Sequence, residues 1–193
     1  MNHRVASIKR TNIIEAALVL FADRGFHGTN VPTIAKHANV GTGTIYRYFE
    51  NKEELVNTVY QIYTNKLFES ITSKFPSDAS TYDQYLFIMK RLIHFAKKNK
   101  KAFIFIETHN HADYLDTTSK ELMRKLENFL RVFIARGVKE SKLRRDLSPE
   151  VLIAIVYGAY VAIFKRIEAG VISDTEELIE GFIRAGWDTI KLL

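Results

Sequence analysis

A short run of hydroxyl and cationic side chains is the part of this sequence best suited to bind a polyanion. The run comprises the exposed positions of one short predicted helix, namely Thr42, Gly43, Thr44, Arg47 and Tyr48. Hydroxyl and guanidinium groups donate hydrogen bonds to phosphate oxygens and base edges, and none of these residues is acidic. Arg47 could read guanine, which accepts two hydrogen bonds from one guanidinium, or could be a solvated surface residue.

A second group, Glu107, His109 and His111, has the residue types of a metal or acid–base site. On a helix, residues two apart face different sides, whereas residues four apart share a face. Glu107 and His111 therefore converge only if their helix continues to His111. A helical metal- or ligand-binding enzyme using this pair, with a non-specific basic N-terminus, is the alternative function. No nucleophile–base pair or glycine-rich phosphate loop supports it, so we expect no catalytic residues, no bound metal and no cofactor.

The elements that position both groups are predicted to be helices, because apolar residues recur at helical spacing nearly everywhere. The expected helices span residues 8–24, 31–38, 42–48, 52–73, 81–98, 101–109, 118–141 and 149–168, with a last one opening at Ser173 and continuing to Leu193. The second and third, joined by the turn Asn39–Val40–Gly41, have the spacing of a helix-turn-helix, whose second helix enters the DNA major groove. An ordinary three-helix packing unit has the same pattern.

Composition limits the class of protein. The 193 residues include no cysteine, so neither a disulfide nor a thiolate metal site is possible. No run of eighteen apolar residues and no signal-peptide core occurs, so we expect no membrane association and a cytoplasmic location. Residues 1–52 carry seven Lys and Arg against three Asp and Glu, whereas residues 146–193 carry four against eight. The basic N-terminal segment suits contact with phosphate.

The segment Ile13–Leu55, with AALVLFADRGFHGTNVPTIAKHANVGTGTIYRYFENKEEL at its heart, closely resembles TetR-type transcriptional regulators. The resemblance combines a Phe-x-x-x-Gly-Phe helix end, an Ile-Ala pair and Gly-Thr-Ile-Tyr-x-Tyr-Phe-x-Asn-Lys-Glu-x-Leu. It implies an all-α fold with a helix-turn-helix DNA-binding domain over residues 1–52 and a helical ligand-binding and dimerisation domain over 53–193. Asn39 and Gly41 depart mildly from the family pattern, since Asn tolerates the left-handed conformation and Gly is an acceptable helix cap.

The resemblance also implies a function, namely a homodimeric repressor that a small-molecule effector releases from a palindromic operator. It assigns Thr29 to a phosphate contact and Lys52 to a phosphate clamp. Thr42, Gly43 and Thr44 would face the major groove. Tyr46 and Tyr48 would contact phosphate or bases, and Arg47 would occupy a recognition position.

The remaining expectations concern the second domain, where the family usually binds a ligand and dimerises. Mostly apolar surroundings with a few polar groups are typical of a small-molecule pocket. The candidate pocket residues are Tyr63, Phe87, Phe103, Glu107, His111, Phe129, Phe133 and Tyr157. Small residues at four-residue spacing allow close helix approach, and apolar residues of the last two helices supply contact area. The candidate dimer residues are Ala154, Ile155, Gly158, Ala162, Phe182, Ile183, Trp187 and Ile190. Ordinary core packing explains either set equally simply.

Overall fold

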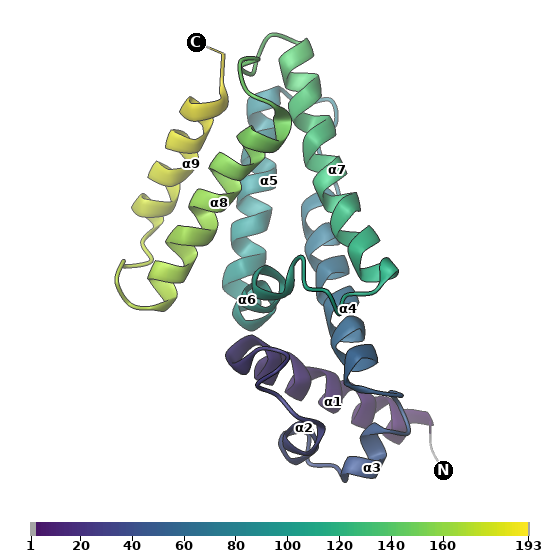
Figure 1. The fold of residues 1–193 in the computed structure, drawn as a ribbon. Coiled ribbons are helices and arrows are strands. Elements are labelled where there is room, and N and C mark those ends of the chain that lie inside the picture. Colours follow the sequence, from purple (N-terminus) through teal and green to yellow (C-terminus); the bar gives the residue numbers. More distant parts are fainter. Residues whose placement is uncertain (1–2, 193) are drawn as a thin grey trace. The chain divides into compact units, whose positions relative to one another are not determined.

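The computed structural model describes the backbone of residues 3–192 and the side chains of residues 6–192. Within that range the chain forms nine helices and no strand beyond one isolated bridge between Leu143 and Lys191 (Figure 1). The helices are α1 His3–Arg24, α2 Val31–His37, α3 Thr42–Ile45, α4 Lys52–Thr72, α5 Thr81–Lys98, α6 Lys100–His109, α7 Thr117–Lys139, α8 Pro149–Glu168 and α9 Glu176–Ile190. The predicted all-α class is confirmed.

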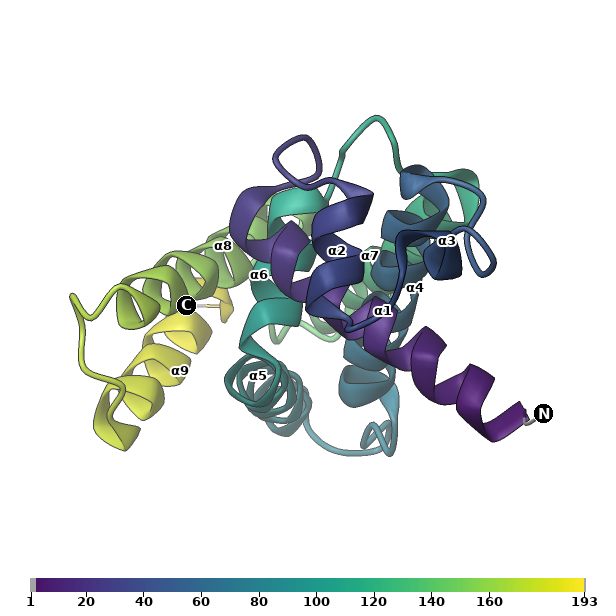
Figure 2. The same ribbon diagram turned by 90° about the horizontal axis from the view of Figure 1, so that it is seen from below.

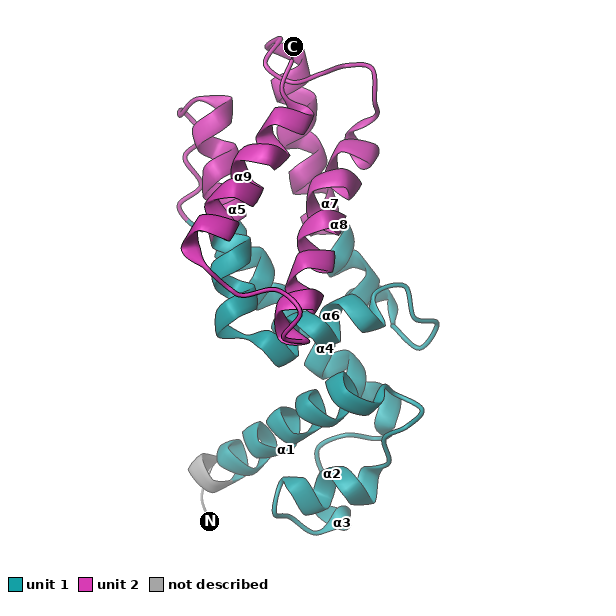
Figure 3. Cartoon of the chain, turned by 90° about the vertical axis from the view of Figure 1, so that its left-hand side faces the viewer, with its two compact units in different colours: residues 1–73, 91–124 teal, residues 74–90, 125–193 magenta. Residues whose placement is uncertain are grey.

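The chain divides into two compact units (Figure 3). The first contains residues 1–73 and 91–124, and the second contains residues 74–90 and 125–193. Helices α5 and α7 each contribute residues to both units. Among the described helices, none is long and apolar enough to cross a membrane.

Local capping chemistry sets the helix boundaries of the first unit. Gly25 ends α1 at a φ of 68°, a conformation that glycine adopts without steric cost. The Asn30 side chain accepts a hydrogen bond from the Thr33 amide at 2.9 Å and so caps α2. Asn39 takes a φ of 53° in the turn before α3. The Asn51 side chain caps α4 by accepting from the Glu54 amide at 2.7 Å. These four boundaries were predicted from the sequence.

Helices α1, α2 and α3 pack as neighbours in the first unit, and Figure 2 shows α2 and α3 beside α1. Ile34, Ile45 and Phe49 are almost fully buried. Phe21 on α1 is also buried, and its ring lies near those of Phe26 and Phe105. Gly28 lies in the α1–α2 loop so close to α1 that an added Cβ would overlap the carbonyl oxygen of Arg24. The short α3 is therefore fixed by its buried residues, which leaves its remaining side chains at the surface.

In the second unit, α9 is attached to α5 through Tyr85, whose hydroxyl donates to the Ile183 carbonyl at 2.9 Å. Gly186 makes room for this contact, since an added Cβ would meet the same hydroxyl. Burial raises the pKa of Tyr85, so its phenol stays protonated and can donate. The Thr175 side chain caps α9 by accepting from the Leu178 amide at 3.1 Å. The predicted helix start at Ser173 is therefore wrong, because the residue that caps α9 is Thr175.

Candidate nucleic-acid interface

One buried residue of α3, Ile45, determines which of the neighbouring side chains face the surface. Ile45 is 1% exposed and holds the helix against α2, whereas Gly43 and Arg47 are exposed and Thr42 and Thr44 are half-buried. A Cβ added at Gly43 would meet nothing within 4 Å. The region therefore presents two hydroxyls, a guanidinium and an uncovered backbone to the outside, which are the donors that a DNA groove accepts.

Tyr46 is the most exposed aromatic residue of this region, with 55% of its surface accessible. A buried tyrosine ring stabilises a fold by removing apolar area from water, and Tyr46 forgoes most of that gain. A ring with a polar tip on a surface of hydrogen-bond donors is suited to contact a sugar–phosphate backbone.

Tyr48 is turned partly into the protein. It is half-buried, and its hydroxyl donates a hydrogen bond to the carbonyl oxygen of Ala6 at 3.0 Å. Arg10 lies over the Phe49 ring, 5.5 Å from its centroid, on the same side of α1. Tyr48 therefore joins the end of the helix-turn-helix to the first turns of α1. This contact is not predictable from the sequence, because the two residues are 42 positions apart.

Lys52 also has an internal role, which differs from the predicted phosphate clamp. Its ammonium donates to the carbonyl oxygens of Phe26 at 2.9 Å and Thr29 at 3.0 Å, and it lies 4.0 Å from the centroid of the Phe26 ring. An ammonium has three protons, so at most one is left for a phosphate. Lys52 thus fixes the loop that leads into α2, and a phosphate contact could only be additional.

The expected phosphate contact of Thr29 is wrong for this structure. The Thr29 side chain is 2% exposed, and its hydroxyl lies 3.1 Å from the Leu20 carbonyl oxygen and 2.9 Å from that of Gly25. The hydroxyl therefore closes the end of α1 and does not reach the surface.

The group around Glu107 does not form the site that helix geometry allowed. Helix α6 ends at His109, and His111 follows it at a φ of 72° with an exposed side chain. Glu107 and His111 therefore do not share a helical face, because the helix does not continue to His111 as their convergence requires. Over the described residues, no group of three or more His, Cys, Asp or Glu side chains could hold a metal ion.

His109 is the histidine of this group that points inward. It is 1% exposed, its Nδ1 lies 2.8 Å from the Phe105 carbonyl oxygen, and Nε2 is among the buried polar atoms without a partner in the described part of the chain. Because a carbonyl accepts, Nδ1 carries the proton and Nε2 does not. Burial among aromatic rings lowers the pKa of the imidazole, although the bond to Phe105 opposes this. His109 is therefore neutral near pH 7.

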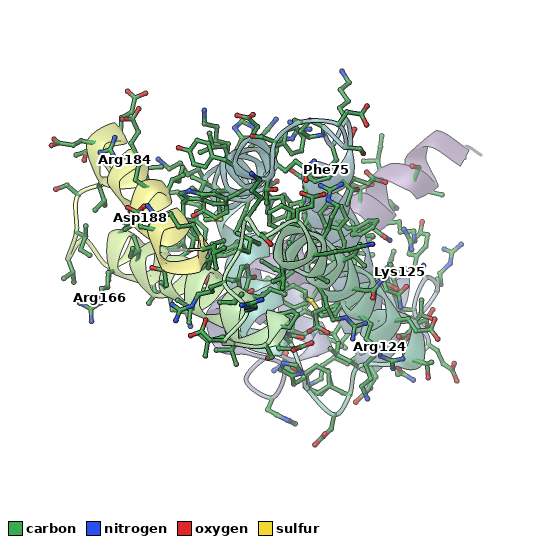
Figure 4. The ribbon with its side chains drawn as sticks, turned by 90° about the horizontal axis from the view of Figure 1, so that it is seen from above. Phe75, Arg124, Lys125, Arg166, Arg184 and Asp188 are labelled. Carbon is green, nitrogen blue, oxygen red and sulfur yellow. The ribbon has the colours of Figure 1, made fainter. Side chains whose placement is uncertain are left out.

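The eight candidate pocket residues fall in both compact units. Tyr63, Phe103, Glu107 and His111 belong to the first, and Phe87, Phe129, Phe133 and Tyr157 to the second. Phe103 is 1% exposed and belongs to the core, whereas Phe87 and Phe129 are half-buried. Both of these rings meet Phe75 edge to face, at 5.9 and 5.1 Å between centroids, and Figure 4 labels Phe75. Phe75 was missed because it precedes a proline and reads as a helix break.

The candidate dimer residues separate into two groups. Ala154, Ile155, Gly158 and Ala162 are exposed on one face of α8, and Val151 extends this apolar strip. Ile183 and Ile190, by contrast, are 5% and 1% exposed, so they belong to the core of the protomer and the expectation that they form an interface is wrong.

Two further α9 residues, Phe182 and Trp187, are half-buried against Tyr160 and Tyr85, with ring centroids 5.9 and 5.4 Å apart. The outer face of α9 is charged, and Figure 4 shows Arg184 and Asp188 projecting from it. The apolar surface of these last two helices that is left for a partner is therefore the strip on α8.

Two family models match consecutive parts of the chain. Residues 13–59 match the model described as bacterial regulatory proteins, tetR family, and residues 60–192 match the model described as tetracyclin repressor-like, C-terminal domain. The fatty acid metabolism regulator protein of Bacillus subtilis is 22% identical over 152 residues, which is 78% of each chain.

Solved structures share the fold over nearly the whole length. A TetR family transcription regulator from Marinobacter aquaeolei VT8 has a TM-score of 0.86 at 20% identity and covers 100% of both chains. The regulator FadR from Bacillus subtilis, solved in complex with stearoyl-CoA, has a TM-score of 0.74 at 20% identity and covers 91% of this chain and 96% of that one.

Proposed function

Because the chain belongs to the TetR family of bacterial regulatory proteins, we propose that it is a repressor that binds a palindromic operator as a homodimer and leaves it when a small molecule binds. It acts in the cytoplasm and catalyses no reaction. The observation that carries the proposal is the set of hydrogen-bond donors on α3 and the turn that follows it. Gly43, Tyr46 and Arg47 are exposed there, and Thr42 and Thr44 are half-buried.

The proposed DNA contacts follow from the availability of each group. Arg47 reads a base edge in the major groove, and Thr42 and Thr44 contact bases or phosphate near it. Gly43 lets the backbone approach the DNA, and Tyr46 lies against the sugar–phosphate backbone. Tyr48 and Lys52 position these residues, since both donate hydrogen bonds to carbonyl oxygens of the protein itself.

Dimerisation supplies the second recognition helix. Two copies of α3 read half-sites about one turn, or ~34 Å, apart on one face of the duplex. The apolar strip on α8, which includes Ile155 and Gly158, is the proposed contact between protomers. A two-fold axis brings the same strip of each protomer together, so the contact is self-complementary.

For the effector we propose a long-chain acyl-CoA. The support is the named activity of one relative, a regulator of fatty acid metabolism, and the stearoyl-CoA bound to one structural neighbour. The half-buried rings of Phe75, Phe87 and Phe129 in the second unit offer an apolar surface of the kind that an acyl chain covers. By linkage, ligand and operator weaken each other's binding by the same factor.

The test is selection of bound sequences from a random DNA pool, followed by release of the selected DNA. The proposal expects a palindrome with half-sites one turn apart. It also expects stearoyl-CoA, but neither free coenzyme A nor stearate, to raise the Kd for that DNA. Arg47→Ala should relax the sequence preference at one base pair of each half-site, whereas Arg145→Ala, which alters an exposed arginine of the second unit, should not. Sequence-independent binding by the wild type would refute the operator, and no response to stearoyl-CoA would refute the effector class.

A further inference from the structure

Tyr114, in the segment between α6 and α7, contacts the loop that leads into the helix-turn-helix. Its ring stacks on Phe26 with centroids 4.1 Å apart and an interplanar angle of 25°. Its ring centroid also lies 6.2 Å from that of His27 and 6.0 Å from that of His109. Phe26 and His27 belong to the loop between α1 and α2, whereas His109 ends α6. Tyr114 therefore joins a segment of the C-terminal half of the sequence to the loop that leads into α2.

The loop that Tyr114 contacts is the one that Lys52 holds. Phe26 is 6% exposed, lies under the Lys52 ammonium and accepts a hydrogen bond from it through its carbonyl oxygen. The same ammonium binds the Thr29 carbonyl, one residue before the cap of α2. The ring of Tyr114 and the ammonium of Lys52 thus both contact the Phe26 side chain, which lies in the loop that leads to the Asn30 cap of α2.

Tyr114 is itself held in place from α4. The Asn57 amide donates to the carbonyl oxygens of Tyr114 and Glu53, each at 2.8 Å. Its oxygen accepts from the Asp116 amide at 2.8 Å and from the Ser119 hydroxyl at 2.7 Å. Asn57 is 5% exposed, and these four bonds use its full hydrogen-bonding capacity. The backbone that carries Tyr114 is therefore fixed to the helix that also carries Lys52.

We propose that Tyr114 is a positioning residue for DNA binding that lies outside the DNA-binding domain. Its ring holds the Phe26 loop, which sets the placement of α2 and hence of α3, so loss of the ring lowers operator affinity without removing any group that touches DNA. This inference rests on the proposed function for its affinity readout, but its structural part, the ordering of residues 25–30, stands independently.

The test compares three variants of the full-length protein. Tyr114→Ala removes the ring, Tyr114→Phe keeps the ring and removes the hydroxyl, and Asp113→Ala alters an exposed residue of the same segment. Amide hydrogen exchange of residues 25–30 reports the loop, and the Kd for the selected operator reports DNA binding. We expect Tyr114→Ala to accelerate exchange in the loop and to weaken operator binding roughly tenfold, which is the order of one buried aromatic pair. Tyr114→Phe and Asp113→Ala should match the wild type in both.

Each other outcome counts against the proposal. Unchanged loop exchange in Tyr114→Ala would overturn it, and so would Tyr114→Phe being as damaging as Tyr114→Ala, because the hydroxyl would then be responsible. If Tyr114→Ala does not fold, Tyr114→Leu combined with Phe26→Leu in a double-mutant cycle replaces it, and additive effects on loop exchange would overturn the proposal. If the wild type selects no operator, the proposed function fails, and the exchange data still decide the role of Tyr114.

Discussion

The internal role of Lys52 leads to a prediction that separates two accounts of this residue. If Lys52 is only a phosphate clamp, its loss weakens DNA binding and leaves the fold intact. In the structure, its ammonium binds two loop carbonyls and lies over the Phe26 ring. Lys52→Met keeps an apolar stem of similar length and removes both hydrogen bonds and the cation–π contact.

The expected cost follows from these three contacts. Hydrogen bonds from a charged donor contribute about 1.5 to 3 kcal/mol each when buried, and a cation–π contact about 0.5 to 1 kcal/mol when exposed. Lys52 is half-buried, and water can replace its bonds to the carbonyls, so the net destabilisation should be ~2 to 3 kcal/mol. The effect should be confined to the first unit, which contains all of these groups.

The assay must measure the stability of the first unit separately from that of the second. The single tryptophan, Trp187, lies in the second unit, so its fluorescence is the internal control and not the readout. Native-state hydrogen exchange of the α2 amides measures the local free energy of opening, which should fall by that amount. The salt dependence of operator binding gives a second readout, because loss of one phosphate contact lowers the slope of log K against log salt by about 0.9. Unchanged α2 protection together with a reduced slope would refute the internal role.

Three further predictions test other parts of the structure. Gly28→Ala should destabilise the first unit by about 1 to 3 kcal/mol, because the added Cβ would overlap the Arg24 carbonyl. Gly43→Ala should not, because the space around its Cβ is open. Urea denaturation followed by circular dichroism compares the stabilities of the two variants. Acidification should destabilise the protein from about pH 6.5 downward, because folding lowers the pKa of His109 and the unfolded chain then binds more protons. In His109→Phe the free energy of unfolding should depend less steeply on pH. An unchanged pH profile of stability would contradict the role of this imidazole. Ile155→Glu should shift the protein from dimer to monomer in sedimentation, and persistence of the dimer would exclude the α8 strip.

Local chemistry made much of the fold predictable. Gly25, Asn30 and Asn51 act on backbone groups within a few residues, so their caps could be read directly from the sequence. The predicted exposed positions hold only in part. Gly43 and Arg47 are exposed, whereas Thr42, Thr44 and Tyr48 are half-buried. The start of α9 was missed because Ser173 and Thr175 are both suitable caps, and only the path of the chain selects Thr175.

Contacts between distant positions could not be predicted from the sequence. Lys52 and Tyr48 have the residue types of DNA-binding groups, yet their donors meet carbonyl oxygens 26 and 42 positions away. Thr29 was misassigned because a hydroxyl that contacts phosphate and one that closes a helix end look identical in sequence. Ile183 and Ile190 were misassigned similarly, since an apolar helix face does not reveal whether it packs within the protomer or against a partner.

The central claim is that α3 reads the operator from the major groove, and chemical protection of the selected operator tests it most directly. Dimethyl sulfate methylates guanine N7 in the major groove and adenine N3 in the minor groove. The account predicts that the protein protects guanine N7 in two clusters one helical turn apart, and that Arg47→Ala restores reactivity at one guanine in each half-site. Protection confined to adenine N3, or unaffected by loss of the Arg47 side chain, would contradict it.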